Sequence, residues 1–395
     1  MTQRLAIVAS HVIQYQDPFF RLLAREPDID LEVLYCSPAG AETYRDEAMN
    51  ATLKWDLELL QGYRYRFISN WSHRADGFMR QINPGLFAAI GRGRYDAVLF
   101  MLGWGTLSAW IGFAACRLFR SPILLFGDSS FLPEETTSRQ QVRAGIMRSL
   151  FRLTTAFMIS GRWNADYYEH YGADPRRFFP LPWAIDNDRF DEASRLAPDE
   201  RSEIRNRLGI RPEAMVVAYS GKLIERKDPL TLLRAFEKMR HRDKAALLFI
   251  GDGELRASVE AYVGEHRLRD VVITGFVNQT EIPKLYGISD AFCLPSSFDP
   301  RATVVNEAMA SGLPVLITDR CGPAGDIARE GENAFIFPFG DVSTLSSRLD
   351  LLASDPALAK RMGERSRDII ATWTYEAGIE GVKAALRFVA LEGAP

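Results

Sequence analysis

The sequence predicts an α/β protein with two domains, each built around a parallel sheet. Short apolar runs alternate with stretches of helical pattern along the chain, and this alternation favours parallel strands joined by right-handed helical crossovers. With 395 residues, the chain is long enough for two separate cores. A charged stretch at 187–215, with prolines at 198 and 212, is the expected connection between them.

Short apolar runs place the strands, and amphipathic runs between them place the helices. In the first half we expect strands at residues 5–10, 31–35, 95–101, 123–126 and 155–160, with an extended run within 61–72 and a short one at 178–182. In the second half we expect strands at 216–220, 246–250, 291–296 and 313–317, and the stretch 271–277 lies between the second and third of these. Helices are expected at 18–25, 139–153, 161–171, 200–208, 229–239, 281–286, 303–311, 341–352, 356–373 and 375–391, with others beginning near 83 and 109.

Composition narrows the class of protein. The chain is 47% hydrophobic and 25% charged with a net charge of -3, which is typical of a soluble globular protein and gives no general attraction to nucleic acid. Its four cysteines are widely spaced, with no metal-binding spacing, as expected in a reducing compartment. The apolar run at the N-terminus is too short for a signal peptide, and charges interrupt the one at 109–126. We therefore expect a cytoplasmic protein.

The stretch 291–317 reads as a strand, a loop, a helix and a strand. Such a loop lies at the carboxyl edge of the sheet, where open α/β sheets bind ligands, and the first helical N–H groups, at Thr303 and Val304, suit a phosphate. Asp299 and Glu307 lie outside the apolar pattern, so both are expected to face a ligand and to accept hydrogen bonds from sugar hydroxyls. Alternatively, Asp299 merely caps the helix and Glu307 lies on the surface.

A second loop, 221–228, joins the strand at 216–220 to the helix beginning at 229. It carries Lys222 and Lys227 just before the helix N-terminus, a cationic arrangement suited to a diphosphate. Simple solvent exposure of both lysines is the alternative.

These stretches resemble the donor site of the retaining family 4 glycosyltransferases, which have the GT-B fold. The family motif is Glu, seven residues, Glu, then Ala-Met-Ala-x-Gly-x-Pro-Val, and here Glu307-Ala308-Met309-Ala310-Ser311-Gly312-Leu313-Pro314-Val315 follows Asp299 at that spacing. Asp299 replaces the first Glu, and Arg301-Ala302-Thr303 replaces the usual Phe-Gly-Leu. The loop at 221–228 is similar to the family's Gly-Arg-Leu-x-x-x-Lys-Gly, with Lys222 at the Arg position and Lys227 at the Lys position.

The resemblance implies two Rossmann-like domains facing each other across a cleft, at 1–188 and 189–374, with a helix at 375–395 returning to the first domain. It implies a nucleotide diphosphate sugar as donor, a glycan or lipid-linked acceptor, and no metal or other cofactor. The implied donor-binding residues are Glu307, Thr303, Val304, Gly221, Gly251, Gly253, Phe276, Val277 and Arg301, and the implied catalytic residues are Asp299, Lys222, Lys227 and Asp128. Asp128 is included because it stands nearest to where the family commonly has a His-Asp pair.

On the acceptor side, His11, Gln14 and Tyr15 are similar to a His-Pro-Ile-Gln-Tyr segment of some family members. Trp104 follows the strand at 95–101 and is a further acceptor-side candidate. A packed loop with a satisfied histidine is the alternative for His11. The basic helix from Arg139 to Arg152 suits either an anionic membrane surface or an ordinary solvated face.

The function expected from the resemblance is transfer of a sugar with retention of anomeric configuration, in polysaccharide or glycolipid biosynthesis. Two alternatives remain open: a GT-B nucleotide-sugar epimerase, which shares the architecture, and a catalytically idle subunit that binds a nucleotide sugar. The differences at Asp299 and Ala302, and the lack of the usual His, keep the idle subunit under consideration.

Overall fold

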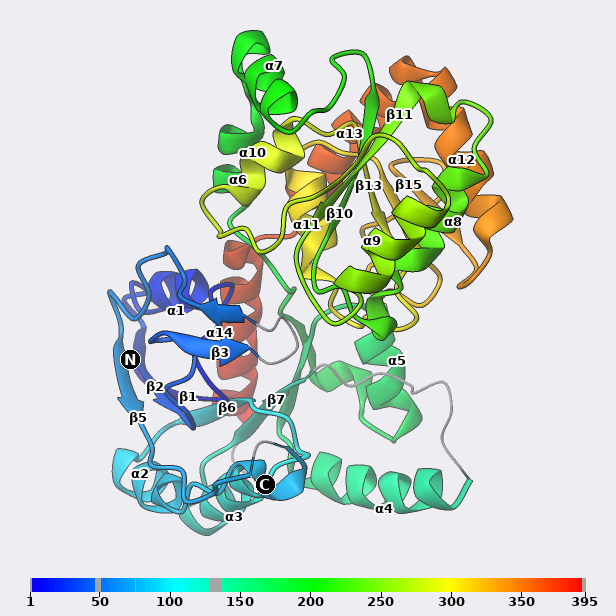
Figure 1. The fold of residues 1–395 in the computed structure, drawn as a ribbon. Coiled ribbons are helices and arrows are strands. Elements are labelled where there is room, and N and C mark those ends of the chain that lie inside the picture. The colour runs from blue at the N-terminus through cyan, green and yellow to red at the C-terminus, as the bar shows by residue number, and fades with distance from the viewer. Residues whose placement is uncertain (1, 47–50, 75, 128–136, 393–395) are drawn as a thin grey trace. The chain divides into compact units, whose positions relative to one another are not determined.

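The computed structural model describes residues 2–46, 51–74, 76–127 and 137–392. Their contacts divide the chain into two compact units. Unit 1 is Met1–Thr43, Glu58–Trp183 and Tyr375–Pro395, and unit 2 is Tyr44–Leu57 and Ala184–Thr374. Each unit has a parallel sheet flanked by helices (Figure 1).

Unit 1 contains a seven-stranded sheet in the order β5-β2-β1-β6-β7-β8-β9, in which every printed pairing is parallel. Its strands are β1 (Gln3–Ala9), β2 (Ile29–Tyr35), β5 (Arg64–Phe67), β6 (Ala97–Met101), β7 (Ile123–Phe126), β8 (Ala156–Ile159) and β9 (Phe178–Pro180). The central strands are continuous apolar runs because helices cover both of their faces.

The helices of unit 1 connect these strands. They are α1 (Asp17–Leu23), η2 (Phe78–Arg80), α2 (Gly85–Gly93), α3 (Leu107–Phe119), α4 (Thr137–Leu153), α5 (Arg162–His170), η3 (Pro175–Arg177) and α14 (Tyr375–Glu392). The last of these comes from the far end of the sequence. Lys383 forms an ion pair with Glu26 at 2.9 Å, and Phe388 packs on Phe179 with ring centroids 5.5 Å apart, so α14 completes unit 1.

Unit 2 contains a six-stranded parallel sheet in the order β12-β11-β10-β13-β14-β15. Its strands are β10 (Met215–Ser220), β11 (Ala245–Ile250), β12 (Val271–Ile273), β13 (Ala291–Leu294), β14 (Val315–Thr318) and β15 (Ala334–Phe337). Its helices are α6 (Asn187–Ser194), α7 (Pro198–Arg207), η4 (Glu225–Lys227), α8 (Pro229–Glu237), η5 (Arg242–Lys244), α9 (Arg256–Glu265), α10 (Ile282–Gly287), α11 (Thr303–Ala310), α12 (Val342–Ser354) and α13 (Pro356–Ile370).

Two features of unit 2 were not anticipated. The pair β3 (Tyr44–Asp46) and β4 (Ala51–Leu53) is antiparallel and lies in residues 44–57, which belong to unit 2 although they fall between two strands of unit 1. The division between the units falls after Trp183 and not after residue 188, as the sequence predicts, because α6 already belongs to unit 2. Asn187 of α6 donates to the carbonyls of Ile370 and Trp373, which holds that helix there.

No helix among the described residues combines the length and the apolar character needed to cross a membrane.

Candidate functional site

The strand order of unit 2 reverses between β10 and β13. From β10 the chain proceeds outward through β11 and β12, and from β13 it proceeds the other way through β14 and β15. Ligands of doubly wound sheets bind at the carboxyl ends of the strands at such a reversal. Here the loops that leave β10 and β13 are joined, since the N–H of Ser297 donates to the carbonyl of Arg226 at 2.9 Å and the Arg226 guanidinium donates to the carbonyl of Phe298 at 2.5 Å.

An ion pair between Lys227 and Asp299 lies at this reversal. The Lys227 ammonium donates to Oδ2 of Asp299, and the two side chains are only 12% and 8% exposed. The other carboxylate oxygen, Oδ1, accepts from the N–H of Ala302 at 3.1 Å and lies 3.8 Å from the Arg226 guanidinium. Asp299 therefore fixes the turn before α11, close to the capping role considered as the alternative, and it also holds Lys227, which the sequence analysis did not consider.

The first turn of α11 begins in a left-handed residue. Ala302 has φ 43° and ψ 48°, a conformation that glycine adopts without the steric cost of a Cβ. The family that this stretch resembles has Gly at this position. Here Ala302 adopts the left-handed conformation that favours Gly. The neighbouring Arg301 is partly buried, and desolvation lowers its pKa to about 10, so it stays charged at neutral pH.

Glycines at the carboxyl edge of the unit 2 sheet allow one loop to pack closely on another. A Cβ on Gly253 would stand 2.5 Å from the carbonyl oxygen of Leu223, and one on Gly251 would stand 2.0 Å from that of Gly221. Gly251 and Gly221 also have φ values of +145° and +136°. The loops after β10 and β11 are thus locked together, which fixes the backbone that carries Lys222.

Glu307 is placed differently from the expectation that it faces the ligand directly. Its residue is 1% exposed, and Oε2 accepts a hydrogen bond from the buried Tyr286 hydroxyl at 3.0 Å. Thr303 and Val304, one turn earlier, are partly exposed, as are Phe276 and Val277 after β12. The structure therefore gathers the predicted donor-binding residues along one edge of the sheet but sets Glu307 beneath it.

In unit 1, the acceptor-side candidates also follow strand ends. His11, Gln14 and Tyr15 follow β1, and Trp104 follows its neighbour β6, so all lie toward the carboxyl edge of that sheet. Nδ1 of His11 lies 2.9 Å from the Ser10 hydroxyl, and the Trp104 ring lies 5.9 Å from the Arg143 guanidinium. Asp128 lies outside the described residues.

The basic helix α4 packs as an amphipathic helix. Met147, Leu150 and Phe151 are buried in the unit 1 core, whereas Arg148 and Arg152 are exposed. This arrangement agrees with either reading of the helix, as a solvated face or as a membrane-facing one.

Sequence reasoning missed two residues of the site. Arg226 adds a second cation beside Asp299, and its position next to Lys227 in a basic loop was an available sign. Tyr286 partners Glu307 across 21 residues of sequence, and a hydrophobic pattern in α10 gives no sign of a buried hydroxyl contact.

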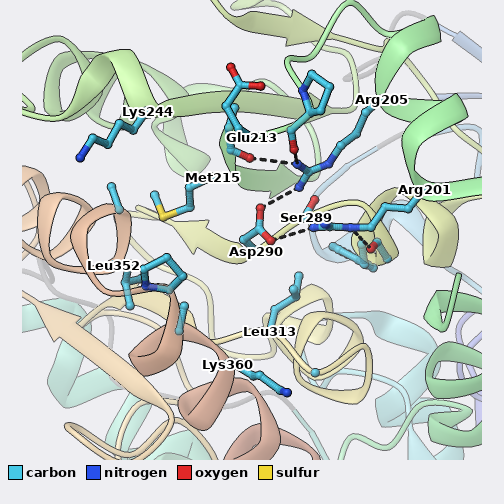
Figure 2. Close-up of a pocket in the computed structure, with 18 of the residues that line it drawn as sticks. Arg201, Arg205, Glu213, Met215, Lys244, Ser289, Asp290, Leu313, Leu352 and Lys360 are labelled. Atoms are coloured by element: carbon cyan, nitrogen blue, oxygen red, sulfur yellow. Dashed lines mark hydrogen bonds and ion pairs between the residues drawn. The ribbon is translucent and has the colours of Figure 1, made fainter. Parts of the chain in front are cut away.

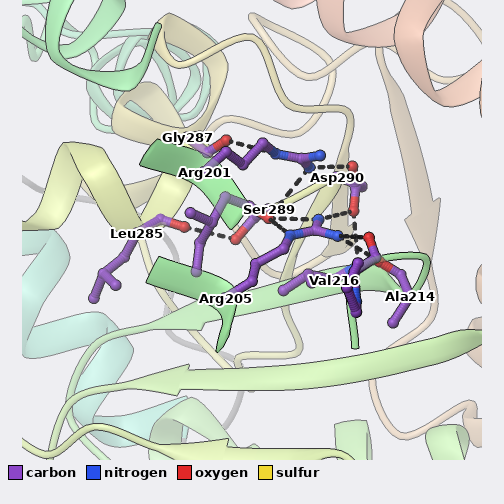
Figure 3. Close-up of polar contacts among 10 residues, drawn as sticks. Arg201, Arg205, Ala214, Val216, Leu285, Gly287, Ser289 and Asp290 are labelled. Carbon is purple, nitrogen blue, oxygen red and sulfur yellow. Dashed lines mark hydrogen bonds and ion pairs between the residues drawn. The ribbon is translucent and has the colours of Figure 1, made fainter. Parts of the chain in front are cut away.

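A hollow in unit 2 lies at the opposite, amino ends of the strands. It is a cavity of about 930 Å³ near Met215, Lys244 and Asp290 (Figure 2). Its arginines are largely committed: Arg205 is buried and donates to Asp290 at 2.7 Å and to the carbonyls of Ala214 and Ile288, and Arg201 also donates to Asp290 at 2.7 Å (Figure 3). This network joins α7 to the sheet, so we assign it a structural role.

No cluster of three or more His, Cys, Asp or Glu side chains suited to a metal ion occurs in the part of the chain that the structure describes.

The fold matches solved glycosyltransferase structures over nearly its whole length. HepE of Anabaena, solved in complex with UDP, superimposes with a TM-score of 0.75 at 15% identity, covering 98% of this chain and 100% of HepE. Sucrose-phosphate synthase of Thermosynechococcus elongatus gives 0.72 at 18% identity, covering 99% and 100%. These likenesses are of fold, and with the two parallel-sheet domains they confirm the GT-B class.

Sequence comparison narrows the class for the second domain. Residues 200–369 match the family model described as glycosyl transferases group 1, a range that contains Lys222, Lys227, Asp299 and Glu307. Spore coat protein SA of Bacillus subtilis is 33% identical over 178 residues, which are 42% of this chain and 46% of that protein. A GDP-mannose-dependent phosphatidylinositol monomannoside mannosyltransferase of Mycolicibacterium smegmatis is 30% identical over 200 residues, 47% and 50% of the two chains. The chain thus spans about half the length of these curated relatives.

Proposed function

We propose that this protein is a retaining glycosyltransferase of family 4 that moves a sugar from a nucleotide diphosphate sugar to a glycan or lipid-linked acceptor. The observation that carries the proposal is the nearly buried Lys227–Asp299 pair at the strand-order reversal of unit 2. The names of similar proteins support the same reaction class, among them a mannosyltransferase acting on a phosphatidylinositol mannoside and a lipopolysaccharide core glycosyltransferase. Polysaccharide or glycolipid biosynthesis is the process we propose.

We propose that the carboxyl edge of the unit 2 sheet catalyses the reaction by electrostatic stabilisation of the leaving group. Departure of the nucleoside diphosphate leaves negative charge on its phosphates, and cations already held in place stabilise that charge most effectively. Lys227 would serve this role, since Asp299 fixes its ammonium before the donor arrives. Lys222 and the N–H groups at the start of α11 would add to it. We therefore propose that no metal ion is needed and that chelation leaves donor binding unchanged.

Asp299 is also proposed to contact the donor sugar. Both of its oxygens already have a protein partner, Lys227 and the N–H of Ala302, but a carboxylate offers about four acceptor positions and retains capacity for a sugar hydroxyl. Because these partners hold it in place, Asp299 suits positioning better than nucleophilic attack. We propose a front-face route to retention through an oxocarbenium-like state, and a sugar trapped covalently on Asp299 would refute it.

Glu307 is proposed to accept hydrogen bonds from the ribose hydroxyls. Its contact with Tyr286 holds the carboxylate at a fixed depth below the edge, so ribose must approach closely or Glu307 must turn toward it. The acceptor is assigned to unit 1, with His11, Gln14, Tyr15 and Trp104 as the candidate contacts. We further propose a cytoplasmic location, with α4 resting on an anionic membrane surface.

The test is a screen of UDP-, GDP-, ADP- and TDP-sugars by thermal shift and calorimetry, with wild-type protein and with Lys227→Ala and Glu307→Ala. We expect micromolar binding of one donor, weakened at least tenfold in both variants because each loses a charged contact worth more than ~1.4 kcal/mol. Lys238→Ala is the matched control, since that exposed lysine lies at the opposite end of α8.

Two outcomes would contradict the proposal. Wild-type protein that binds no donor would remove the donor site, and binding that survives in Lys227→Ala would place it elsewhere. Product analysis of the bound donor then separates the alternatives: turnover without any acceptor indicates an epimerase, whereas binding without turnover on a broad acceptor panel indicates an idle subunit.

A further inference from the structure

Residues 44–57 lie between two stretches of unit 1 in the sequence but belong to unit 2. We call these residues the arm. Its second half, residues 54–56, is attached to the loop after β12. The Asn278 side chain donates to the carbonyl of Lys54 at 2.7 Å, and the carboxylate of Asp56 accepts from both the N–H of Thr280, at 3.2 Å, and its hydroxyl. The arm is therefore fixed by hydrogen bonds on both sides of one residue, Trp55.

Trp55 lies against Phe276. The ring centroids are 6.4 Å apart with an angle of 60° between the planes, the tilted geometry of a favourable aromatic pair. Both residues are only partly buried, so the pair keeps accessible ring surface. An arm that served only to close a hydrophobic core would be expected to bury its tryptophan fully.

The order of the strands places this pair relative to Lys227, because Phe276 follows β12 and Lys227 follows β10. Phe276 follows Gly275, which forms a bridge with Gly251 after β11, and Gly251 packs on Gly221 after β10. The ends of β12 and β10 are two strands apart, or about 10 Å at the usual strand spacing. An extended nucleotide with its diphosphate beside Lys227 would reach that far along the edge with its base.

We propose that Trp55, supplied by the arm, forms with Phe276 an aromatic wall for the base of the donor nucleotide. This rests on the proposed function, because it assumes that the diphosphate lies beside Lys227. Aromatic rings bind any base through its π-face, so the wall contributes affinity for the base and not for the phosphates. The side chains of Asn278 and Thr280 hold the arm, which makes them positioning residues.

The experiment compares the donor identified by the screen, as its nucleoside diphosphate, with ribose 5-diphosphate, which lacks the base. Calorimetry is run on wild type, Trp55→Ala, Trp55→Phe and Lys54→Ala. We expect Trp55→Ala to weaken nucleoside diphosphate binding about tenfold, with ribose 5-diphosphate unchanged. Trp55→Phe should stay within about threefold of wild type, because it keeps a ring. Lys54→Ala is the matched control, since Lys54 is exposed and the variant keeps the backbone carbonyl that accepts from Asn278.

Asp56→Ala gives a second, independent test, since it releases the arm from Thr280 and leaves both rings intact. We expect a smaller loss, again confined to the ligand that carries a base. Equal losses for both ligands, or no loss in Trp55→Ala, would overturn the aromatic wall while leaving the donor site standing. Wild-type protein that binds neither ligand would instead refute the donor site itself, and the wall with it.

Discussion

The carboxyl edges of the two sheets are built differently. In unit 2, loops pack backbone against backbone, as at Gly253 and Leu223, and a nearly buried ion pair joins the loops after β10 and β13. In unit 1, Gly103 and Gly105 follow β6, and a Cβ on either would meet no atom of the described residues within 4 Å. The loops after β10 and β11 have little room for larger residues, whereas the loop after β6 has ample room. The rest of the unit 1 edge is not uniformly open, since a Cβ on Gly40 would stand 2.1 Å from the carbonyl oxygen of Val12. Under the proposed function, the closed loops of unit 2 suit the donor and the open loop after β6 suits the acceptor.

The largest effect is expected from adding one methyl group to the closed edge. Gly253→Ala places a Cβ within 2.8 Å of three backbone atoms of Leu223, and backbone cannot rotate away, so we expect a loss of about 3 kcal/mol in unfolding free energy. Gly103→Ala in unit 1 should change it by less than about 0.5 kcal/mol. Urea unfolding followed by tryptophan fluorescence measures both. Similar losses in the two variants would remove the contrast between the edges.

A smaller effect is expected from breaking the ion pair. Lys227→Met leaves the Asp299 carboxylate largely buried without its main partner, which we expect to cost about 2 kcal/mol, below the range for fully buried pairs because Arg226 lies 3.8 Å away. Asp299→Asn keeps an acceptor for the N–H of Ala302 and removes only the negative charge. In a double-mutant cycle the two losses should be less than additive.

The exposed pair Arg66–Glu32 in unit 1 is the comparison for that cycle. Its atoms are 2.9 Å apart, but the arginine is 46% exposed, so Arg66→Met should cost no more than about 0.5 kcal/mol. Additive losses at Lys227 and Asp299 would mean that the pair contributes no coupling, as at an ordinary surface.

The smallest effect is expected at Ala302. Glycine relieves the left-handed strain, while its greater freedom in the unfolded chain opposes the gain, so Ala302→Gly should raise the unfolding free energy by less than about 1 kcal/mol. The same thermal and urea measurements apply. A clear loss of stability would show that the turn before α11 is not strained by its Cβ.

Much of the fold could be predicted because its signals are local. β7 spans the predicted residues 123–126, and β10 and β11 differ from prediction by one residue at one end. Parallel strands buried on both faces are continuous apolar runs, which are easy to recognise in the sequence. Lys222, Lys227 and Asp299 could be predicted to lie at one edge of the sheet because each follows such a strand.

What the sequence did not reveal depends on contacts between distant residues. Glu307 lies buried and accepts a hydrogen bond from the hydroxyl of Tyr286, which comes from another helix. The arm at 44–57 contains two three-residue strands, too short for a periodic signal, and its anchors Asn278 and Thr280 are more than two hundred residues away. Neither feature follows from a local pattern.

The interleaved order of the chain bears on biosynthesis. Unit 1 is assembled from three stretches of sequence, and the third, which contains α14, is translated only after all of unit 2. Lys383 therefore cannot reach Glu26 until the ribosome has made the entire second domain. Unit 1 begins before unit 2 in the sequence and is completed after it, so the surface that binds α14 stays uncovered while unit 2 is synthesised.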